Sequence, residues 1–386
     1  MSVRTAVRTV DFAPPDLGEA EIDEVVAALR SGWLSTGPRV HQFERAFADY
    51  VGSPHAIAVN SCTAALHLSL LVAGIEPGDE VVTTPLTFCA TANVIVHAGA
   101  TPVFADVDPV TMNLTPESAA AQTTARTRAW LPVHFAGRPI DTAGFRAAAS
   151  ARGLTLIEDA AHCVEGVSGG AKIGVTGDLT CFSFYATKNL TTGEGGMVTT
   201  ANDAWAERIR VASLHGMSRD AWARYSVAGP SRYDVIVPGF KYNMTDLQAA
   251  IGLHQLRSLD LRHVYRSRLW ARYDAGLADL PLVRPAATPE GDRHARHLYT
   301  VLVDEAACGL TRDQVQAALR DRGIATSVHF GAVHLHTYYA ERFGFRRGMC
   351  PVAESIADRT LSLPLSSGMS NAAADRVVDA LHVVLR

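Results

Sequence analysis

The feature that most constrains this chain is a single lysine, Lys188, in a turn between two predicted strands. Leu179–Tyr185 is a run of apolar, aromatic and hydroxyl residues that predicts a buried strand, and Met197–Thr200 predicts another. The turn is rich in threonine and glycine, which let another group approach the backbone closely. Burial lowers the pKa of an amine and frees its lone pair, so Lys188 is suited to form an imine with a carbonyl cofactor. The same pattern also fits a solvated lysine beside a loop.

An acidic pair follows another predicted strand. Leu154–Ile157 is apolar and is followed by Glu158 and Asp159. Ligands of open α/β sheets lie at the carboxyl ends of parallel strands. A carboxylate there can hold the protonated pyridine nitrogen of pyridoxal phosphate (PLP), the cofactor that forms a Schiff base with lysine. Asp159 is therefore a candidate partner of the PLP ring, which it would keep cationic; the alternative is a carboxylate that caps the next helix.

A third candidate site lies where a predicted strand, His55–Val59, meets a predicted helix, Cys62–Leu71. Small and hydroxyl residues at this junction leave backbone N–H groups free at the positive end of the helix dipole. Such a junction predicts a phosphate site. Many helices begin with Ser or Thr only as caps, so this pattern alone leaves both readings open.

The predicted elements define two parts of the chain. Up to Ile157, apolar strands alternate with helices, which indicates an α/β fold with a mainly parallel sheet covered on both faces. We predict a large PLP-binding domain over residues 1–259 and a small α+β domain over residues 260–386. Around and beyond this boundary the predicted elements are helices Leu247–Leu259 and Arg262–Leu277, strand His297–Asp304, helix Arg312–Arg322 and strand Ala325–Phe330.

Bulk properties exclude several classes of protein. The 386 residues are 48% hydrophobic and 19% charged with a net charge of −4, and no block of like charges argues for nucleic acid or an anionic membrane surface. No apolar run reaches the ~20 residues that a membrane-spanning helix needs. Met1–Val10 lacks the apolar core of a signal peptide. The six cysteines are scattered without a Cys-x-x-Cys pair, so we expect a soluble cytoplasmic protein.

Several motifs together resemble the DegT/DnrJ/EryC1/StrS family of PLP-dependent nucleotide-sugar aminotransferases, which have the aspartate aminotransferase fold (fold type I). The similarity runs from Gly32–Pro38 to Leu361–Leu365. Gly323–Phe343 is most similar to the branch that aminates C4 of nucleotide 4-keto sugars. The central motifs are Asp159–His162, Phe182–Asn189 and Gly193–Gly196.

The resemblance implies which residues hold the cofactor. Lys188 would hold PLP as an internal aldimine and move the proton, with pyridoxamine phosphate formed during the cycle. Phe88 would stack on the pyridine ring and His162 would lie near its phenolic oxygen, although both also fit ordinary core positions. The phosphate would be bound by Cys62, Thr63 and Ser183, and by Asn243 of the neighbouring subunit. Each site would then need two chains, which implies a homodimer.

The resemblance also implies residues near the substrate: Trp33, Thr36, His215 and His329. The segment around Trp33 also reads as a tight linker. We predict no metal site, because the spacing of His329, His334 and His336 fits no standard ligand set, and we expect His334 and His336 to be surface residues. Ser218–Val237 predicts an irregular loop near the active site.

The implied reaction is transamination from L-glutamate to C4 of a nucleotide-linked 4-keto-6-deoxyhexose. The alternatives are a 3-keto sugar, a UDP-linked 4-keto pentose or a cyclitol ketone, the last with glutamine as donor. A non-enzymatic PLP-binding regulator is a further alternative. PLP-dependent sugar dehydratases of the family carry histidine in place of the lysine, so Lys188 argues against that activity.

Overall fold

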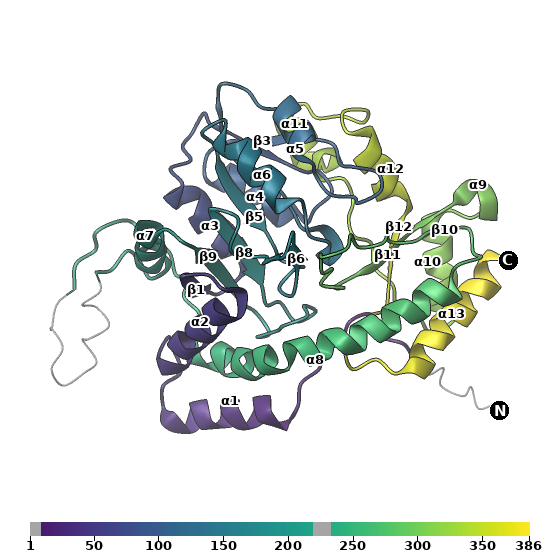
Figure 1. Ribbon diagram of the computed structural model, residues 1–386, viewed down its shortest axis with the longest axis horizontal. Helices are drawn as coiled ribbons and strands as arrows, with labels where there is room; N and C mark the ends of the chain where they lie inside the picture. The colour runs from purple at the N-terminus through teal and green to yellow at the C-terminus, as the bar shows by residue number, and fades with distance from the viewer. Residues whose placement is uncertain (1–8, 219–232) are drawn as a thin grey trace.

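A seven-stranded sheet forms the centre of the molecule, with the strand order β1-β9-β8-β5-β4-β2-β3 (Figure 1). The computed structural model describes residues 9–218 and 233–386. Most of the predicted loop Ser218–Val237 therefore lies outside the described residues. The strands are β1 (His55–Val59), β2 (Glu80–Thr83), β3 (Thr101–Phe104), β4 (Thr127–Leu131), β5 (Thr155–Asp159), β8 (Leu179–Ser183) and β9 (Gly196–Thr200).

The sheet is mainly parallel, as the sequence predicts. Strands β3, β2, β4, β5 and β8 pair in parallel, and only β9 runs against its neighbours β1 and β8. The carboxyl ends of β1, β2, β5 and β8 therefore lie at the same edge of the sheet. Ligands of open α/β sheets bind at that edge.

Helices cover both faces of this sheet because successive strand residues point to opposite sides. Val81 packs in one cluster with residues of α3 (Cys62–Val72), α4 (Cys89–His97) and α7 (Asp203–Ser213). The next residue, Val82, packs on the other side with α5 (Pro116–Ala121) and α6 (Thr142–Ser150). On that second side, α2 (Pro38–Val51) and the start of α8 cover the β1–β9–β8 end.

Helix α8 (Asp246–Gly276) is 31 residues long and contacts α1 (Glu19–Ser31), α2 and α13 (Asn371–Leu385). It runs along the lower side of the molecule in Figure 1. The two helices predicted at Leu247–Leu259 and Arg262–Leu277 are thus one continuous helix. The boundary predicted between residues 259 and 260 falls inside it, and the division into two domains stays a prediction.

A smaller antiparallel sheet lies in the C-terminal part, with β11 (Tyr299–Val303) between β10 (Leu282–Val283) and β12 (Thr360–Leu363). It shares a core with α10 (Arg312–Asp321), α13 and the end of α8. Val10 joins this core and pairs with Ile324, so the start of the described chain packs against its C-terminal part.

The strand predicted at Ala325–Phe330 is wrong. Only Ser327 pairs with the sheet, through a single bridge to Ser362. Beyond Ser327 the backbone leaves the sheet edge, because His329 and Phe330 pack on aromatic rings instead: His329 stacks on Phe12. The remaining elements are β6 (Val167–Ser168), β7 (Ala171–Lys172), α9 (Glu305–Cys308), α11 (Thr337–Phe343), α12 (Pro351–Arg359) and the 3₁₀ turns η1 (Phe135–Gly137) and η4 (Val333–Leu335).

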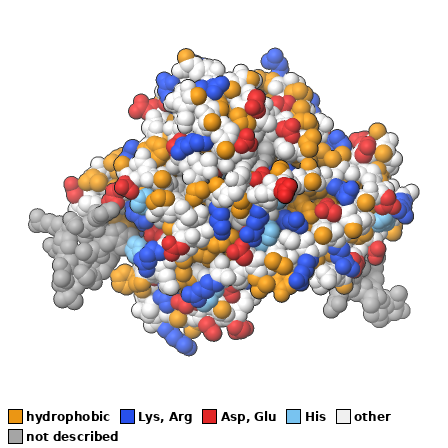
Figure 2. Space-filling view, in the orientation of Figure 1, with side chains coloured by type: hydrophobic (Ala, Val, Ile, Leu, Met, Phe, Trp, Pro, Cys, Tyr) orange, Lys and Arg blue, Asp and Glu red, His pale blue; other side chains and the backbone are white. Residues whose placement is uncertain are grey.

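Acidic and basic side chains are interspersed on the face shown in Figure 2. Among the described residues, no helix is long and apolar enough to cross a membrane. All six cysteines are free thiols.

Candidate active site

Lys188 lies in a closed turn at the carboxyl end of β8. Its N–H donates to the carbonyl of Tyr185 at 2.9 Å, and the N–H of Thr192 donates to the carbonyl of Phe184 at 2.9 Å. Burial lowers the pKa of Lys188 to about 8, while Cys62 and Asp159 act in the opposite direction. Because the usual pKa of lysine is 10.5, this amine gives up its proton far more readily than one on the surface.

Asp159 is the last residue of β5 and is almost fully buried. Its Oδ2 accepts a hydrogen bond from Thr91 Oγ1 at 2.8 Å, and its Oδ1 accepts one from the N–H of Ala161 at 3.1 Å. Burial raises the pKa of Asp159, although these two hydrogen bonds and Lys188 oppose the shift. A protonated ring nitrogen in front of this carboxylate would lower its pKa, so the site favours a cationic group.

The N-terminus of α3 has the form of a phosphate cradle. Ser61 caps the helix and accepts a hydrogen bond from the N–H of Ala64 at 3.1 Å. The N–H groups of Cys62 and Thr63 have no acceptor among the described residues, so they remain available to an anion. A Cβ added at Gly196 would lie 2.5 Å from the carbonyl carbon of Ser61, so this position of β9 requires glycine.

Ser183 joins the same place through the sheet. It pairs with Gly196 across β8 and β9, and Gly196 pairs in turn with Val59 at the end of β1. The hydroxyl of Ser183 accepts one hydrogen bond, from the N–H of Tyr185 at 3.4 Å. The sheet register thus brings Ser183 beside the start of α3.

Three rings, those of Phe88, Phe330 and His162, pack in sequence with one another. Phe88 is 59% exposed, unusual for a phenylalanine, and its ring centroid lies 6.1 Å from that of Phe330. Phe330 is stacked with His162 at 5.9 Å. Nδ1 of His162 is buried without a hydrogen-bond partner among the described residues, and burial and Lys188 hold the pKa of this ring well below its usual value. An exposed ring face and an open nitrogen fit a flat aromatic cofactor with a polar substituent.

Trp33, Thr36 and Asn243 form one hydrogen-bonded cluster. Trp33 Nε1 donates to the carbonyl of Thr36 at 2.9 Å, and Asn243 Nδ2 donates to Thr36 Oγ1 at 2.7 Å. Asn243 also pairs with Val59, the last residue of β1. The structure therefore brings these three residues together beside the end of β1.

Of the two histidines predicted near the substrate, the structure brings His329 but not His215 into the surroundings of Lys188. His329 Nδ1 lies 2.9 Å from Ser362 Oγ, and burial and Lys188 lower the pKa of His329 to about 4. This ring therefore belongs to the surroundings of Lys188. His215 is exposed just after α7, and its N–H donates to the carbonyl of Phe240 at 2.8 Å. Within the described part of the chain, no contact joins the His215 ring to Lys188.

The prediction that His334 lies on the surface is wrong. His334 is buried, with Nε2 2.9 Å from Glu354 Oε1, because α12 packs the carboxylate of Glu354 against it. His336 is exposed. In residues 9–218 and 233–386, no group of three His, Cys, Asp or Glu side chains is arranged to hold a metal ion.

Sequence reasoning missed several residues around Lys188. Phe330 follows a predicted residue, His329, and its aromatic character was a usable signal. Thr91, whose hydroxyl donates to Asp159, lies on a helix of mainly apolar and small residues. That composition gave no signal for this contact. Asn189, which follows Lys188, is hydrogen-bonded to the buried Glu165, and only the fold reveals that contact.

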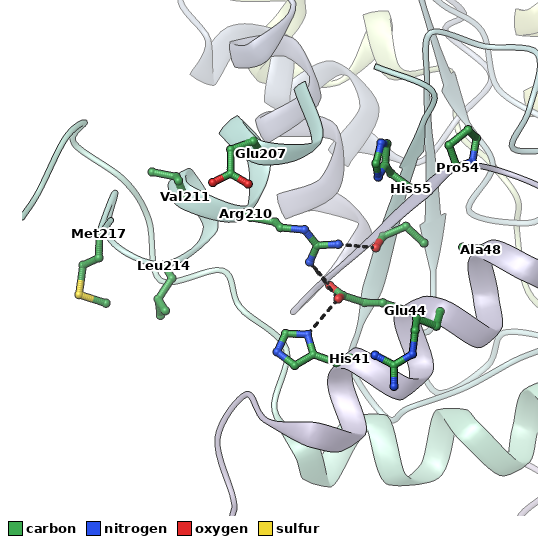
Figure 3. Close-up of a pocket in the computed structure, with 12 residues that line it drawn as sticks. His41, Glu44, Ala48, Pro54, His55, Glu207, Arg210, Val211, Leu214 and Met217 are labelled. Atoms are coloured by element: carbon green, nitrogen blue, oxygen red, sulfur yellow. Dashed lines mark hydrogen bonds and ion pairs between the residues drawn. The ribbon is translucent and has the colours of Figure 1, made fainter. Parts of the chain in front are cut away.

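A separate pocket of about 400 Å³ lies between α2, β1 and α7 (Figure 3). Arg210 donates to both carboxylate oxygens of Glu44 at 2.9 Å and to the carbonyl of Ala56 at 3.2 Å. Glu44 also accepts from the N–H of Ala58 at 2.9 Å. None of the residues predicted to bind the cofactor or the substrate lines this pocket.

Comparison with known proteins identifies the family. Residues 15–382 match the sequence model of the DegT/DnrJ/EryC1/StrS aminotransferase family. The chain belongs to this family. It is 51% identical to the spore coat polysaccharide biosynthesis protein SpsC of Bacillus subtilis (strain 168) over 377 residues, which is 97% of each chain.

Solved structures agree with this assignment. The putative sugar aminotransferase Spr1654 from Streptococcus pneumoniae, in its pyridoxamine phosphate form, superposes with a TM-score of 0.91 at 34% identity and covers 97% of this chain and 98% of its own. Its PLP form gives 0.90. DesV of S. venezuelae gives 0.87 at 35% identity, with 97% of this chain and 99% of that one covered. The chain is thus a PLP-dependent aminotransferase of fold type I, as predicted.

Proposed function

We propose that this aminotransferase moves an amino group from L-glutamate to C4 of a nucleotide-linked 4-keto-6-deoxyhexose, with Lys188 as its catalytic residue. The observation that carries the proposal is the buried amine of Lys188, with its pKa lowered to about 8 beside the carboxylate of Asp159. An amine that loses its proton near neutral pH can attack a carbonyl and then act as a base.

The side chains around Lys188 have separate roles in this proposal. Bound PLP supplies an electron sink for the negative charge left when a C–H bond is broken. Asp159, fixed by Thr91, would hold the ring nitrogen, and Phe88 would stack on the ring. Lys188 Nζ takes the Cα proton of the donor and, in the second half-reaction, delivers a proton to the sugar carbon that receives the nitrogen.

The phosphate end of the cofactor is assigned to α3. The free N–H groups of Cys62 and Thr63, with the helix dipole behind them, would bind the phosphate, and Ser183 would add its hydroxyl. His162, neutral and with Nδ1 open, is assigned to the phenolic oxygen. His329, whose pKa of about 4 keeps it neutral, is assigned to the sugar or diphosphate of the substrate.

The enzyme acts as a homodimer with shared sites in this proposal. Asn243 of one chain reaches the cofactor phosphate of the other, and Trp33 and Thr36 lie in the same hydrogen-bonded cluster. Mixing inactive Lys188→Ala and Asn243→Ala proteins tests the arrangement. Mixed dimers contain one intact site and regain turnover if the sites are shared, whereas separate sites would leave the mixture inactive.

Absorbance spectra test the assignment of donor and acceptor. The PLP-loaded protein is expected to be yellow and to bleach when L-glutamate is added; a 4-keto-6-deoxyhexose nucleotide should then restore the colour. Bleaching by glutamine alone would favour a cyclitol acceptor instead. Recovery only with 3-keto or pentose nucleotides would contradict the proposed acceptor. A yellow protein that no amino acid bleaches would contradict the enzymatic proposal itself.

A further inference from the structure

Asn189, the residue after Lys188, is the centre of a buried polar network. Its Nδ2 donates to the two carboxylate oxygens of Glu165 at 3.2 and 3.0 Å, and to the carbonyl of Ala295 at 2.9 Å. Its Oδ1 lies 3.2 Å from Nδ1 of His297. All four polar contacts of this amide are made to segments distant in sequence from the lysine turn.

The chemistry of these groups fixes the orientation of the amide. A carboxylate only accepts hydrogen bonds, so the nitrogen of Asn189 must face Glu165 and its oxygen must face His297. His297 then carries its proton on Nδ1. Burial and Lys188 hold the pKa of His297 well below its usual value, so the ring is neutral. Its centroid lies 4.5 Å from that of His162, the candidate cofactor contact.

Glu165 is itself anchored to the long helix α8. The carboxylate is completely buried and forms an ion pair with Arg266, whose side chain is 2% exposed. A buried carboxylate needs such a partner, because an unpaired charge in this environment is very costly. Through Glu165, the side chain of Asn189 is thereby connected to α8, which packs against α1, α2 and α13.

We propose that Glu165, Asn189 and Arg266 are positioning residues for Lys188, and that His297 extends the same network to His162. In the described part of the chain, the main-chain hydrogen bonds of the lysine turn run from the N–H of Lys188 to Tyr185 and from the N–H of Thr192 to Phe184. The side chain of Asn189 fixes the part between them. The inference depends on the catalytic role proposed for Lys188, since a misplacement of that amine by about 1 Å is enough to cost about 10²-fold in rate.

Four variants test this inference: Asn189→Ala, Asn189→Asp, Glu165→Gln and the double variant Glu165→Gln/Asn189→Asp. Asn189→Asp places two carboxylates together and is expected to lower kcat the most, by about 10²-fold. In the double variant the new amide at position 165 can donate to the new carboxylate at position 189, so the clash between two carboxylates is removed and kcat should recover at least about tenfold over Asn189→Asp. The KM for the amino donor should stay within about threefold throughout, since this proposal gives the network no role in binding the donor.

Two further readouts separate positioning from loss of folding. The affinity of the apo-protein for PLP, and the pH midpoint of the absorbance of lysine-bound PLP, are expected to change in Asn189→Ala and Asn189→Asp. Glu44→Gln replaces one carboxylate that lines the pocket in Figure 3. This control should leave the PLP affinity and the pH midpoint at the values of the unchanged enzyme.

The outcomes distinguish the two proposals. If the unchanged protein does not attach PLP at Lys188, the proposed function fails. If it does, and folded Asn189→Ala and Asn189→Asp proteins keep the kcat, PLP affinity and pH midpoint of the unchanged enzyme, this inference alone is wrong. Failure of the double variant to improve on Asn189→Asp would also overturn it.

Discussion

Two of the buried glutamates that pair with arginines, Glu165 and Glu44, differ in one respect: of the two, Glu165 contacts the lysine turn and Glu44 does not. Glu165 and Arg266 are 0% and 2% exposed, whereas Glu44 and Arg210 are 8% and 37% exposed. Both carboxylates accept further hydrogen bonds from other parts of the chain. Glu44 receives the backbone N–H of Ala58, while Glu165 receives the side chain of Asn189.

The comparison indicates that the role of a buried ion pair depends on which other group donates to its carboxylate. Pairing with β9 already holds the backbone of β1, so the Glu44 pair mainly joins α2 to α7 and β1. The side chain of Asn189 lies in a turn and is held by Glu165 together with Ala295 and His297, so we expect the Glu165 pair to set the place of a reactive amine. The two pairs should therefore separate in experiment: both contribute to stability, but we expect only the Glu165 pair to affect turnover.

The largest expected effect is on stability. Arg266→Met leaves Glu165 buried and without its cation, which should lower the free energy of unfolding by about 3–5 kcal/mol. Arg210→Met should cost only about 1–2 kcal/mol, because Arg210 is partly exposed and Glu44 keeps other donors. Chemical denaturation of the two proteins measures both values. An equal or greater loss in Arg210→Met would contradict the burial argument.

A double replacement separates stability from positioning. Glu165→Leu/Arg266→Met removes both charges, so the free energy of unfolding should recover by about 2 kcal/mol over Arg266→Met alone. Turnover should stay at least about tenfold low, because Asn189 has lost its carboxylate acceptor and keeps only Ala295 among the acceptors described. Glu44→Leu/Arg210→Met is the matched control and should keep its turnover. Normal turnover in the first double variant would mean that the buried pair serves stability only.

The acid limb of the stability curve gives a smaller effect. Burial raises the pKa of Glu44, but hydrogen bonds from His41 and Ala58 and the charge of Arg210 lower it by more. The pKa of Glu44 therefore lies below its usual value of 4.5. The stabilisation from this group is thus present above pH 4.5 and lost as the pH falls through the lower folded value. Melting temperatures of the unchanged protein and of Glu44→Gln should differ most near neutral pH and converge in acid. A gap that widens below pH 4.5 would contradict this sign.

The pKa of Lys188 predicts a change in a rate. Between the folded value of about 8 and the usual 10.5, the buried amine is largely neutral while a surface lysine is not. PLP should therefore attach to the apo-protein at a rate that rises with pH and levels off above about 8. Glu44→Gln should leave this midpoint in place. A midpoint near 10.5 would show that Lys188 is solvated.

Much of the fold was predictable from sequence, because local patterns carry it. Strand β1 was predicted with its observed bounds at His55–Val59, since an apolar run is followed by a helix start at Cys62. The predicted break in α8 was wrong because the arginines after residue 260 suggested a separate helix, although no glycine or proline lies between Leu259 and Arg262. Ala325–Phe330 has strand composition, but its last two residues pack on the aromatic rings of Phe12 and Phe88 and are not paired with the sheet.

The site was predictable where a motif lies within a few residues and not where contacts span the chain. Lys188 and Asp159 were visible because each follows a strand that ends at the same edge. Glu165, 24 positions before Asn189, and Arg266, 101 positions after Glu165, are joined only by the packing of α8 on the lysine turn. No periodicity or spacing in the sequence records that contact.

Reductive trapping tests the central claim most directly. The chain has three lysines, Lys172, Lys188 and Lys241, so borohydride reduction of the PLP-loaded protein followed by peptide mass mapping can assign the attachment site without ambiguity. We expect the cofactor on the peptide that contains Lys188 and nowhere else, with the label lost in Lys188→Ala. A label on Lys172 or Lys241, or no label on any lysine, would contradict the account.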